Sequence, residues 1–424
     1  MLRLATFQVD CTPPEGYPSG FGTSDEPTGF RDPLYLRGFI LDHGGDRCVI
    51  ASLDYCGLMN SAHDDLIRAL ATSVEILPDR SVVACVHQHD APLLNFEIEA
   101  YLGRETYPRS WWEEVVDRCA ITAADALDRL AEVGSVGHAE TRLLGYASNR
   151  RTLGPDGKVR GMRYSRCADE GLRSEPVGVI DPMLRTLAFR EPSGELMATM
   201  SFYATHPQVA NGRGMYSADA QGEAMRLLAG EQGGAQHAYF SGPFGNVTAG
   251  KYSSPTDLEG NLLGFGKLLA DGIGQNMRGM GWHEPDGFEW KTASFTFPRD
   301  ELGREAMEKA LADSDVPEGQ KVIHASILSS ADNPANTDYP MRLLQIGPVR
   351  VLFLGGEPFV EYQLYVQSLI PDAFIAVAAN CSGSFLYIPT ADAFDQGGYE
   401  VESFRWCTRA FEGRFQRAVR DLVG

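Results

Sequence analysis

The segment SVVACVHQHDAP, Ser81–Pro92, starts as a continuous apolar run and ends in a polar loop that holds His87 and His89. A short apolar run rich in β-branched residues, here Val82–Val86, is typical of a strand buried on both faces. If this strand continued to His89, both imidazoles would project from the same face, because side chains alternate along a strand. The pair would then suit two metal ligands, or one ligand and one general acid or base. Two histidines that only cap a buried strand are the structural alternative.

Strands and helices mix throughout the rest of the chain, which predicts the α/β class with a mixed α+β arrangement. We expect mixed β-sheets flanked by helices. The predicted strands are Leu34–Leu41, Cys48–Leu53, Val82–Val86, Met183–Phe189, Leu196–Tyr203, Ala238–Phe240, Met341–Ile346, Val349–Phe353 and Phe374–Ala378. The predicted helices are Asp64–Ala71, capped by Asn60 or Ser61, and then Trp111–Leu130, Gly222–Ala229, Leu262–Ile273 and Phe404–Leu422. Neither an internal repeat nor a linker is apparent, so we expect a single domain over residues 1–424.

The formal net charge of −20 argues against nucleic acid and anionic membrane surfaces as partners, because both repel an acidic protein. We expect a small-molecule substrate, no nucleic acid and no stable membrane anchor, and a homo-oligomer stays open. The N-terminal residues MLRLATFQVD lack the long apolar core of an export signal. Together with the absence of a long apolar stretch, this predicts a cytoplasmic protein. The eight cysteines include no CxxC pair, which favours reduced, buried thiols.

Sites in such sheets usually lie where strands end, and three further segments place reactive side chains there. His206 follows the predicted strand Leu196–Tyr203, although a lone histidine after a strand is more often structural. Glu357 follows an apolar strand, where a carboxylate needs a paired charge or a cation unless it marks the start of a helix. Tyr387 and Tyr399 lie in a loop-rich stretch, where tyrosines usually only pack.

Several common catalytic motifs are missing from the sequence. It contains neither GxSxG nor HExxH, so it does not support the usual serine hydrolase or the zinc protease that carries the second motif. The glycine-rich segment SGPFGNVTAG (241–250) lacks the Gly-Lys-Ser/Thr of a phosphate-binding loop. We expect it to form a tight active-site loop after a strand.

The order of these segments resembles the catalytic domain of the neutral, non-lysosomal ceramidases and their bacterial relatives. The resemblance spans almost the whole chain and rests on a series of short motifs. VDCTPPEG (9–16) resembles a VDITPP-type start, and DPLYLRGFIL (32–41) and IASLDYCG (50–57) resemble the next two strands. VHQHDAP (86–92) is similar to THTHSGP or THTHSAP, SNRR (148–151) to NRSP, and DPMLRTLAF (181–189) with ATMSFYATHP (198–207) to a segment that ends in HP. SGPFGNVTAG (241–250) stands at the place of a GD-SP loop, GGEPF (355–359) resembles PGE, and YIPTADAFDQGGYE (387–400) resembles a segment that ends in YE.

What the resemblance implies is a single zinc ion, Zn²⁺. By motif position its ligands are His87, His206, Glu357 and Tyr387. The residues that would face the substrate are His89, Arg150 and Tyr399. Zinc lowers the pKa of bound water to about 7, and the resulting hydroxide can attack an amide carbonyl. Histidine, arginine and tyrosine are suitable donors to stabilise the oxyanion and to protonate the leaving amine.

The surroundings of this set depart from the family pattern more than the set itself does. Asp54, at the end of the strand before that of His87, is a candidate to orient a ligand imidazole. Asp90 stands where the family has serine, and Asn246 stands where its GD-SP loop has an acidic residue. Arg151 stands where NRSP has serine. The motifs therefore support zinc-dependent hydrolysis more strongly than they support ceramide as the substrate.

The sequence predicts a zinc-dependent hydrolase that cleaves a C–N amide bond of an N-acyl compound, a ceramidase-like amidase. One alternative keeps the zinc but changes the bond to that of an ester, a lactone or a carbohydrate derivative. The other is a non-catalytic metal-binding module. The presence of His89, Arg150 and Tyr399 argues against this last alternative.

Overall fold

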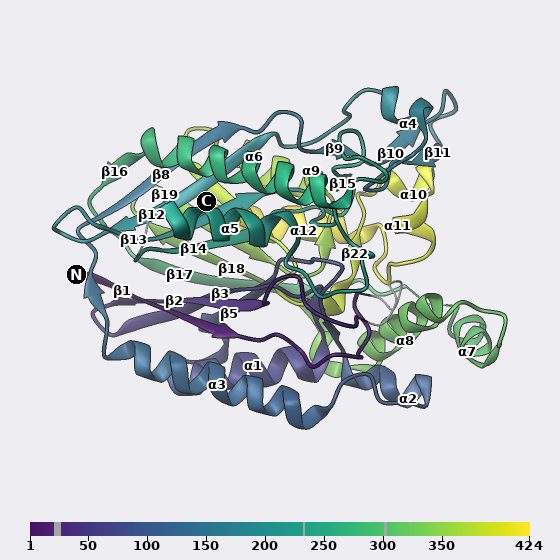
Figure 1. Cartoon of the computed structure of the whole chain (residues 1–424), viewed down its shortest axis with the longest axis horizontal. Coiled ribbons are helices and arrows are strands. Elements are labelled where there is room, and N and C mark those ends of the chain that lie inside the picture. Colours follow the sequence, from purple (N-terminus) through teal and green to yellow (C-terminus); the bar gives the residue numbers. More distant parts are fainter. Residues whose placement is uncertain (21–26, 232–233, 301–302) are drawn as a thin grey trace.

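Three large β-sheets surround one hydrophobic core in the computed structural model, which describes residues 1–20, 27–231, 234–300 and 303–424 (Figure 1). The first sheet has the strand order β5 (Ser81–Cys85), β3 (Asp46–Leu53), β2 (Tyr35–His43), β1 (Leu2–Asp10) and β7 (Ala131–Glu132). The second has the order β14 (Gln236–Ser241), β13 (Leu196–Tyr203), β12 (Met183–Arg190), β8 (Ser135–Arg142) and β16 (Gly281–His283). The third has the order β17 (Glu289–Thr296), β18 (Asp338–Ile346), β19 (Val349–Leu354) and β21 (Phe374–Ala378).

Helices cover the outer face of each sheet. They are α1 (Asn60–Ser73) and α3 (Arg109–Leu127) on the first sheet, α5 (Asp219–Glu231) and α6 (Leu258–Arg278) on the second, and α9 (Val360–Leu369) and α12 (Ala410–Val423) on the third. In Figure 1, α1 and α3 run along the lower side of the molecule and α5 and α6 along the upper side. This arrangement buries both faces of the central strands, which is why their sequences read as continuous apolar runs.

Shorter elements connect these layers. The remaining helices are α2 (Glu99–Leu102), α4 (Glu170–Ser174), α7 (Arg304–Ala312), α8 (Glu318–Asp332), α10 (Ala393–Gln396) and α11 (Tyr399–Glu402). Single 3₁₀ turns lie at Pro78–Arg80, Phe96–Ile98, Pro334–Thr337 and Gly383–Phe385. Two-stranded pairs join β4 (Gly57–Leu58) to β6 (Leu93–Leu94), β9 (Ser148–Asn149) to β15 (Val247–Thr248), β10 (Arg151–Leu153) to β11 (Val159–Met162), and β20 (Glu357–Pro358) to β22 (Tyr387–Ile388). α7 and α8 project from the rest of the molecule on the right of Figure 1.

Each large sheet contains the same local topology, an antiparallel hairpin followed by a helix and a strand that returns parallel to the second hairpin strand. The three units are β2–β3–α1–β5, β12–β13–α5–β14 and β18–β19–α9–β21. The sequence contains no apparent repeat that corresponds to this pattern. In every unit the two parallel strands end at the same edge of their sheet, and loops at such edges are where sites form.

The predicted class, mixed β-sheets flanked by helices, is confirmed, and the strand of the opening segment is buried on both faces. Val82 and Ala84 point into the core shared by the three sheets, whereas Val83 and Cys85 pack toward α1 and α3. The strand does not continue to the second histidine, however, because β5 ends at Cys85. The backbone of His87 then turns into the left-handed region with a φ of 82°.

The start of α1 also differs from the prediction. The helix begins at Asn60 rather than near Asp64, its N-cap is Met59, and Asn60 itself has a φ of 50°. The Asn60 side chain is used elsewhere, since its amide nitrogen donates to Asn95 Oδ1 at 3.1 Å. A buried amide with such partners is a tertiary contact, which local capping preferences do not predict.

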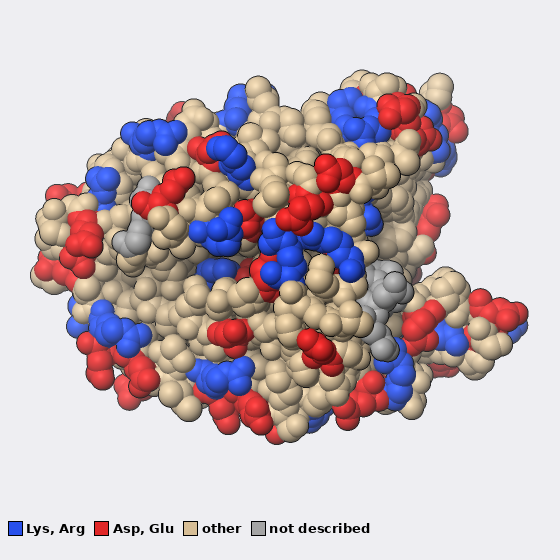
Figure 2. All heavy atoms as spheres, viewed as in Figure 1, with Lys and Arg blue, Asp and Glu red and all other residues tan. Residues whose placement is uncertain are grey.

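The surface view agrees with a mixed distribution of charge. Over the face in Figure 2, lysine and arginine side chains are interspersed with aspartate and glutamate. Ion pairs account for part of this pattern, since Glu259 binds both Arg31 at 3.0 Å and Arg213 at 2.6 Å. Among the helices in the described parts of the chain, none combines the length and the apolar character needed to cross a membrane.

Candidate functional site

Loops from all three sheets meet at one buried site. His87 and His89 follow β5 of the first sheet, and His206 follows β13 of the second. Glu357 and Tyr387 lie after β19 and β21 of the third sheet, where β20 and β22 pair in parallel and put the two residues side by side. The carboxyl ends of the three parallel strand pairs thus carry five of the residues that the sequence singled out, whereas Arg150 lies between β9 and β10 and Tyr399 begins α11.

Three of the predicted ligands converge on one point. His87 Nε2 lies 3.5 Å from Glu357 Oε2, and His206 Nε2 lies 3.3 Å from the same oxygen. The ligand atoms of His87, His206 and Glu357 all lie within 4.8 Å of one another, and all three residues are buried. The Tyr387 hydroxyl lies 3.1 Å from His206 Nε2. The structure therefore brings together the four residues that the motifs selected.

Backbone carbonyls fix which nitrogen of each imidazole faces Glu357. His87 Nδ1 lies 2.6 Å from the carbonyl oxygen of Cys56, and His206 Nδ1 lies 3.0 Å from that of Val247. A carbonyl can only accept, so each Nδ1 carries the proton and donates it. In a neutral ring the Nε2 lone pair then points toward the carboxylate. Burial, followed by the charge of Arg150, lowers the pKa of His206 to about 4, which makes this ring neutral at pH 7.

A lone pair and a carboxylate oxygen at 3.3 Å repel each other unless a cation lies between them. Burial opposes ionisation of Glu357, whereas the protonated forms of His87 and His206, together with the charge of Arg150, lower its pKa. Its Oε2 is buried and accepts no hydrogen bond from the described residues. Two imidazole nitrogens, one carboxylate and one phenol oxygen form a donor set that suits zinc. The residues present therefore fit a metal ion.

The backbone around this point holds conformations that side chains rarely adopt. His87 has a φ of 82°, Asn380 of 55° and Leu386 of 50°. Such conformations cost free energy and cluster at functional sites. Asn380 compensates through its side-chain nitrogen, which donates to the Cys56 carbonyl at 3.0 Å. The same carbonyl accepts from His87, so Asn380 helps to fix the carbonyl that orients this imidazole.

The three residues predicted to face the substrate surround the same point. The rings of His87 and His89 lie edge to face with centroids 4.8 Å apart. Burial, and then the neighbouring His87 and His206, lower the pKa of His89 well below its usual value. The ring of Tyr399 lies 6.0 Å from that of Tyr387, and burial raises the pKa of the Tyr399 phenol. At neutral pH these two side chains are therefore a neutral imidazole and a neutral phenol.

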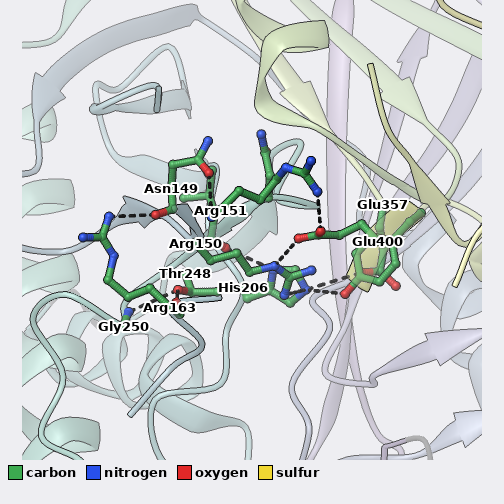
Figure 3. Close-up of polar contacts among 12 residues, drawn as sticks. Asn149, Arg150, Arg151, Arg163, His206, Thr248, Gly250, Glu357 and Glu400 are labelled. Atoms are coloured by element: carbon green, nitrogen blue, oxygen red, sulfur yellow. Dashed lines mark hydrogen bonds and ion pairs between the residues drawn. The ribbon is translucent and has the colours of Figure 1, made fainter. Parts of the chain in front are cut away.

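Arg150 contacts both His206 and a buried carboxylate. Its Nη1 is 3.5 Å from His206 Nε2, and its Nε donates to Glu400 Oε1 at 2.7 Å (Figure 3). The guanidinium carbon lies 5.1 to 5.8 Å from the ring centres of Tyr387, Tyr164 and Tyr399. Aromatic faces attract a cation, so the three rings stabilise the guanidinium in a site closed to water.

The expected role of Asp54 needs correction. Its carboxylate pairs with Arg37 at 2.7 Å and accepts from the Gln88 side chain at 3.2 Å. It does not hydrogen-bond to the imidazoles of His87 or His206 in the described structure, because the carbonyls of Cys56 and Val247 already occupy that position. Among the described residues, the Asp54 carboxylate contacts the histidine loop through the Gln88 side chain.

The other two neighbours also make specific contacts. Asp90 turns away from the ligand atoms and accepts from the backbone nitrogen of Gly212 at 2.8 Å, while burial raises its pKa to about 6. The backbone oxygen of Asn246 accepts from Arg150 N at 2.8 Å. The Asn246 side chain binds Val360 N at 2.9 Å and Glu361 at 2.8 Å, which fixes the loop that carries Glu357.

Sequence reasoning missed several residues of the site. Glu400 and Asn380 were not singled out, although Glu400 directly follows a selected tyrosine. Cys56 was also not singled out, yet its Sγ groups with His87 and His89 as a second candidate ligand set. Burial, and then the charge of Glu357, raise the pKa of the Cys56 thiol well above its usual value, which makes it a poor metal ligand.

A cavity of about 710 Å³ opens beside the site, next to Tyr399. α7 and α8 form one wall, and α11 with the residues that follow it forms the other. Its lining mixes apolar and polar side chains from Met307, Pro317, Glu318, Gln320, Ile323, His324, Tyr399, Glu402, Ser403 and Phe404. Tyr399 thus has neighbours in both the site and the cavity.

Comparison with known proteins gives a match in structure only. No protein-family model and no curated protein sequence matches the chain. A solved ceramidase complexed with C2 matches with a TM-score of 0.75 and 16% sequence identity, covering 99% of this chain and 74% of that one. Neutral ceramidase from Pseudomonas aeruginosa matches with a TM-score of 0.74 at 16% identity, over 99% of this chain and 74% of that one. The resemblance predicted from the motifs is thus confirmed at the level of the fold, and the chain has the fold of the neutral ceramidases.

Proposed function

We propose that this protein is a zinc-dependent hydrolase that cleaves the C–N amide bond of an N-acyl compound. One observation carries the proposal. The Nε2 atoms of His87 and His206 both face Oε2 of Glu357, at 3.5 and 3.3 Å, and all three residues are buried. A bound cation resolves the repulsion that this geometry otherwise creates.

His87, His206, Glu357 and Tyr387 would hold the metal. When bound, zinc supplies a Lewis acid that polarises a carbonyl group and acidifies a water molecule. The carbonyls of Cys56 and Val247 keep both imidazoles in the tautomer that such binding requires. Neighbouring side chains must then handle the protons and the charge that develops on the carbonyl oxygen.

His89 is the group suited to move the proton. Its imidazole is neutral at neutral pH, and its ring lies 4.8 Å from that of His87, so it is placed to accept a proton from the attacking water. Its Nδ1 lies 3.0 Å from the carbonyl oxygen of His87, which orients the ring. The proton that His89 accepts can then pass to the nitrogen of the leaving amine.

Arg150 and Tyr399 are the groups suited to bind the carbonyl oxygen. Tyr399 keeps its proton because burial raises its pKa, so it can only donate to an oxyanion. Arg150 is always charged and lies within 5.8 Å of the Tyr399 ring centre. Together, these two donors would stabilise a tetrahedral intermediate.

The cavity beside Tyr399 supports an N-acyl substrate without selecting ceramide. Met307, Ile323 and Phe404 offer apolar surface to an acyl chain, whereas Glu318 and His324 bring polar atoms to the same space. This mixed lining also keeps open the alternative of a polar ester, lactone or carbohydrate derivative.

The test is a panel of substrates offered to zinc-loaded protein of known metal content. The panel holds N-acyl sphingosines, N-acyl amino acids, lactones and glycosides, each assayed for its own product. Release of a primary amine from an N-acyl compound supports the proposal. Turnover of lactones or glycosides alone would replace the amidase by the alternative hydrolase. Stoichiometric zinc with no turnover would indicate a binding module.

A further inference from the structure

Glu400 is a fully buried carboxylate that two arginines share. Its Oε1 accepts from Arg150 Nε at 2.7 Å, and its Oε2 accepts from Arg151 Nη1 at 2.7 Å. The Glu400 side chain has no exposed surface, and those of Arg150 and Arg151 are 2% and 4% exposed. Figure 3 shows the carboxylate between the two guanidinium groups. Both oxygens are engaged, so neither the carboxylate nor the Arg150 Nε can turn without breaking a charged hydrogen bond.

Arg150 keeps one donor that this arrangement does not use. Its Nη2 is buried and donates to no partner among the described residues. The backbone of Arg150 is equally fixed, since its nitrogen donates to Asn246 O at 2.8 Å and its oxygen accepts from Arg163 N at 2.6 Å. A buried charged donor without a partner costs free energy unless a ligand completes it. The unused donor therefore indicates that a ligand supplies an oxygen atom to accept this hydrogen bond.

Arg151 faces away from this donor and contacts the loop that carries Glu400. Its Nη2 donates to the Gly397 carbonyl at 2.8 Å and to Gln396 Oε1 at 3.2 Å. Its guanidinium carbon also lies 5.2 Å from the ring centre of Phe359. Arg151 is thus satisfied by the chain itself, and its connection to the site passes through Glu400.

We propose that Glu400 and Arg151 are positioning residues that fix Arg150 so that its Nη2 binds the acyl oxygen of the substrate, and the carboxylate of the product after cleavage. The inference rests on the proposed function, because it takes Arg150 to face an N-acyl substrate. It adds two residues and a ligand class, the carboxylate released from an N-acyl compound. It also gives a role to Arg151, which stands where the family motif has serine.

Glu400 could act through its charge alone or by positioning Arg150, and the two explanations predict opposite changes in anion binding when Glu400 is replaced. If Glu400 mattered only through its charge, replacing it by glutamine would make the site more positive and would strengthen binding of an anion. If Glu400 positions Arg150, the same replacement releases the guanidinium and weakens anion binding. Loss of correct geometry by about 1 Å can cost up to about a hundredfold in rate.

The first experiment measures acetate binding to the zinc-loaded full chain by calorimetry. We expect Glu400→Gln to weaken acetate binding by about tenfold or more, and to lower kcat/KM mainly through kcat. Arg151→Lys, which keeps the charge but loses the planar fork, should give a smaller loss. Arg151→Met combined with Glu400→Gln should bind acetate no more weakly than Glu400→Gln alone, since Arg151 acts through Glu400. Asp395→Asn, which removes an exposed carboxylate paired with Arg409, is the matched control and should leave binding unchanged.

The second experiment needs no ligand. Proton exchange at the Arg150 Nε–H, followed by nitrogen-15 NMR in the metal-loaded protein, reports whether Glu400 holds the guanidinium. We expect slow exchange in the wild type and in Asp395→Asn, and fast exchange in Glu400→Gln. Unchanged exchange in Glu400→Gln, or acetate binding that becomes tighter, would overturn the positioning role. Wild-type protein that holds zinc but binds no acetate would instead refute the substrate role of Arg150, and with it the ligand class, while the exchange data still decide whether Glu400 positions it.

Discussion

Nε2 of His206 lies 3.3 Å from Oε2 of Glu357, while Nδ1 of the same ring lies 3.0 Å from the carbonyl oxygen of Val247. The neutral imidazole has one N–H group, at Nδ1, and this group donates to the carbonyl oxygen of Val247. Burial disfavours a second proton on the ring and lowers the pKa of His206 to about 4. The contact between His206 and Glu357 therefore differs from an ordinary ion pair, and its geometry supports the proposed cation site.

Replacing Glu357 by glutamine should remove the metal. The amide keeps the size of the side chain but loses the negative charge that binds a divalent cation, so zinc affinity should fall by about a hundredfold or more. Competition with a chelator of known affinity, read out by metal analysis, measures the change. Glu361→Gln removes a carboxylate close by in the sequence that binds Asn246 and should retain most of the zinc. Equal zinc affinity in the wild type and Glu357→Gln would contradict the assignment of Glu357 as a ligand.

Metal removal should also destabilise the protein. A ligand that binds only the folded state stabilises it by about 4 kcal/mol at a thousand times its dissociation constant. Chelation should therefore lower the unfolding temperature of the wild type, and zinc should restore it, in calorimetric scans. Glu357→Gln should show little response to the chelator. A wild type whose unfolding temperature ignores both chelator and zinc would rule out a tightly bound ion.

Gly245 tests how closely the loops pack around the site. A Cβ at this position would lie 2.4 Å from the carbonyl oxygen of Glu357, and backbone atoms can yield only if the loop moves. Gly245→Ala should lower both zinc affinity and the free energy of unfolding, the latter by about 1 to 3 kcal/mol. Denaturant titration and metal analysis measure the two effects.

Gly264 in α6 is the control for this change, since a Cβ there meets nothing within 4 Å. Gly264→Ala should be neutral or should stabilise the helix by up to about 1 kcal/mol. Similar losses in both alanine variants would mean that the close approach at Gly245 has no special importance.

His237 predicts how stability depends on pH away from the site. It is 4% exposed on β14, its Nδ1 lies 2.8 Å from Thr199 Oγ1, and burial lowers its pKa to about 4. The unfolded chain binds this proton with a pKa near 6.5, so unfolding takes up a proton between these values. The free energy of unfolding should fall as the pH drops from about 6.5 to about 4, by up to about 3 kcal/mol.

His237→Gln should flatten this part of the pH dependence. Urea titrations at several pH values measure the free energy of unfolding of both proteins, and the difference between them isolates the contribution of His237. If the two curves stay parallel from pH 7 to pH 4, His237 does not titrate as its burial implies.

The sequence predicted best where one residue type and one spacing decide the outcome. The predicted strands Val82–Val86, Met341–Ile346 and Val349–Phe353 correspond closely to β5, β18 and β19. α9 escaped prediction, because VEYQLYVQSL is nearly as apolar as a buried strand and too short for its period to stand out. Periodicity also gave no sign of the threefold repeat of topology, which is a pattern of strand pairing and not of residues.

The sequence also predicted some residues of the candidate site and missed others. The proposed metal ligands could be selected because they lie in motifs with a definite order, and the structure brings them together. Glu400 and Arg150 could not be paired in advance, since 250 residues separate them and only the tertiary fold makes them neighbours. The true orienting groups of His87 and His206 are backbone carbonyls, which no side-chain pattern reveals. The single domain, the cytoplasmic location and the open question of a homo-oligomer stay predictions.

We propose that His87, His206 and Glu357 hold a zinc ion that drives amide hydrolysis. This proposal is tested most directly by titrating metal-stripped protein with Zn²⁺ while primary amine release from the panel of N-acyl compounds is followed. We predict that the rate rises with zinc and saturates at about one ion per chain, and that Glu357→Gln stays inactive over the same range. Amine release that is independent of zinc, or none from any N-acyl compound at saturating zinc, would contradict the account.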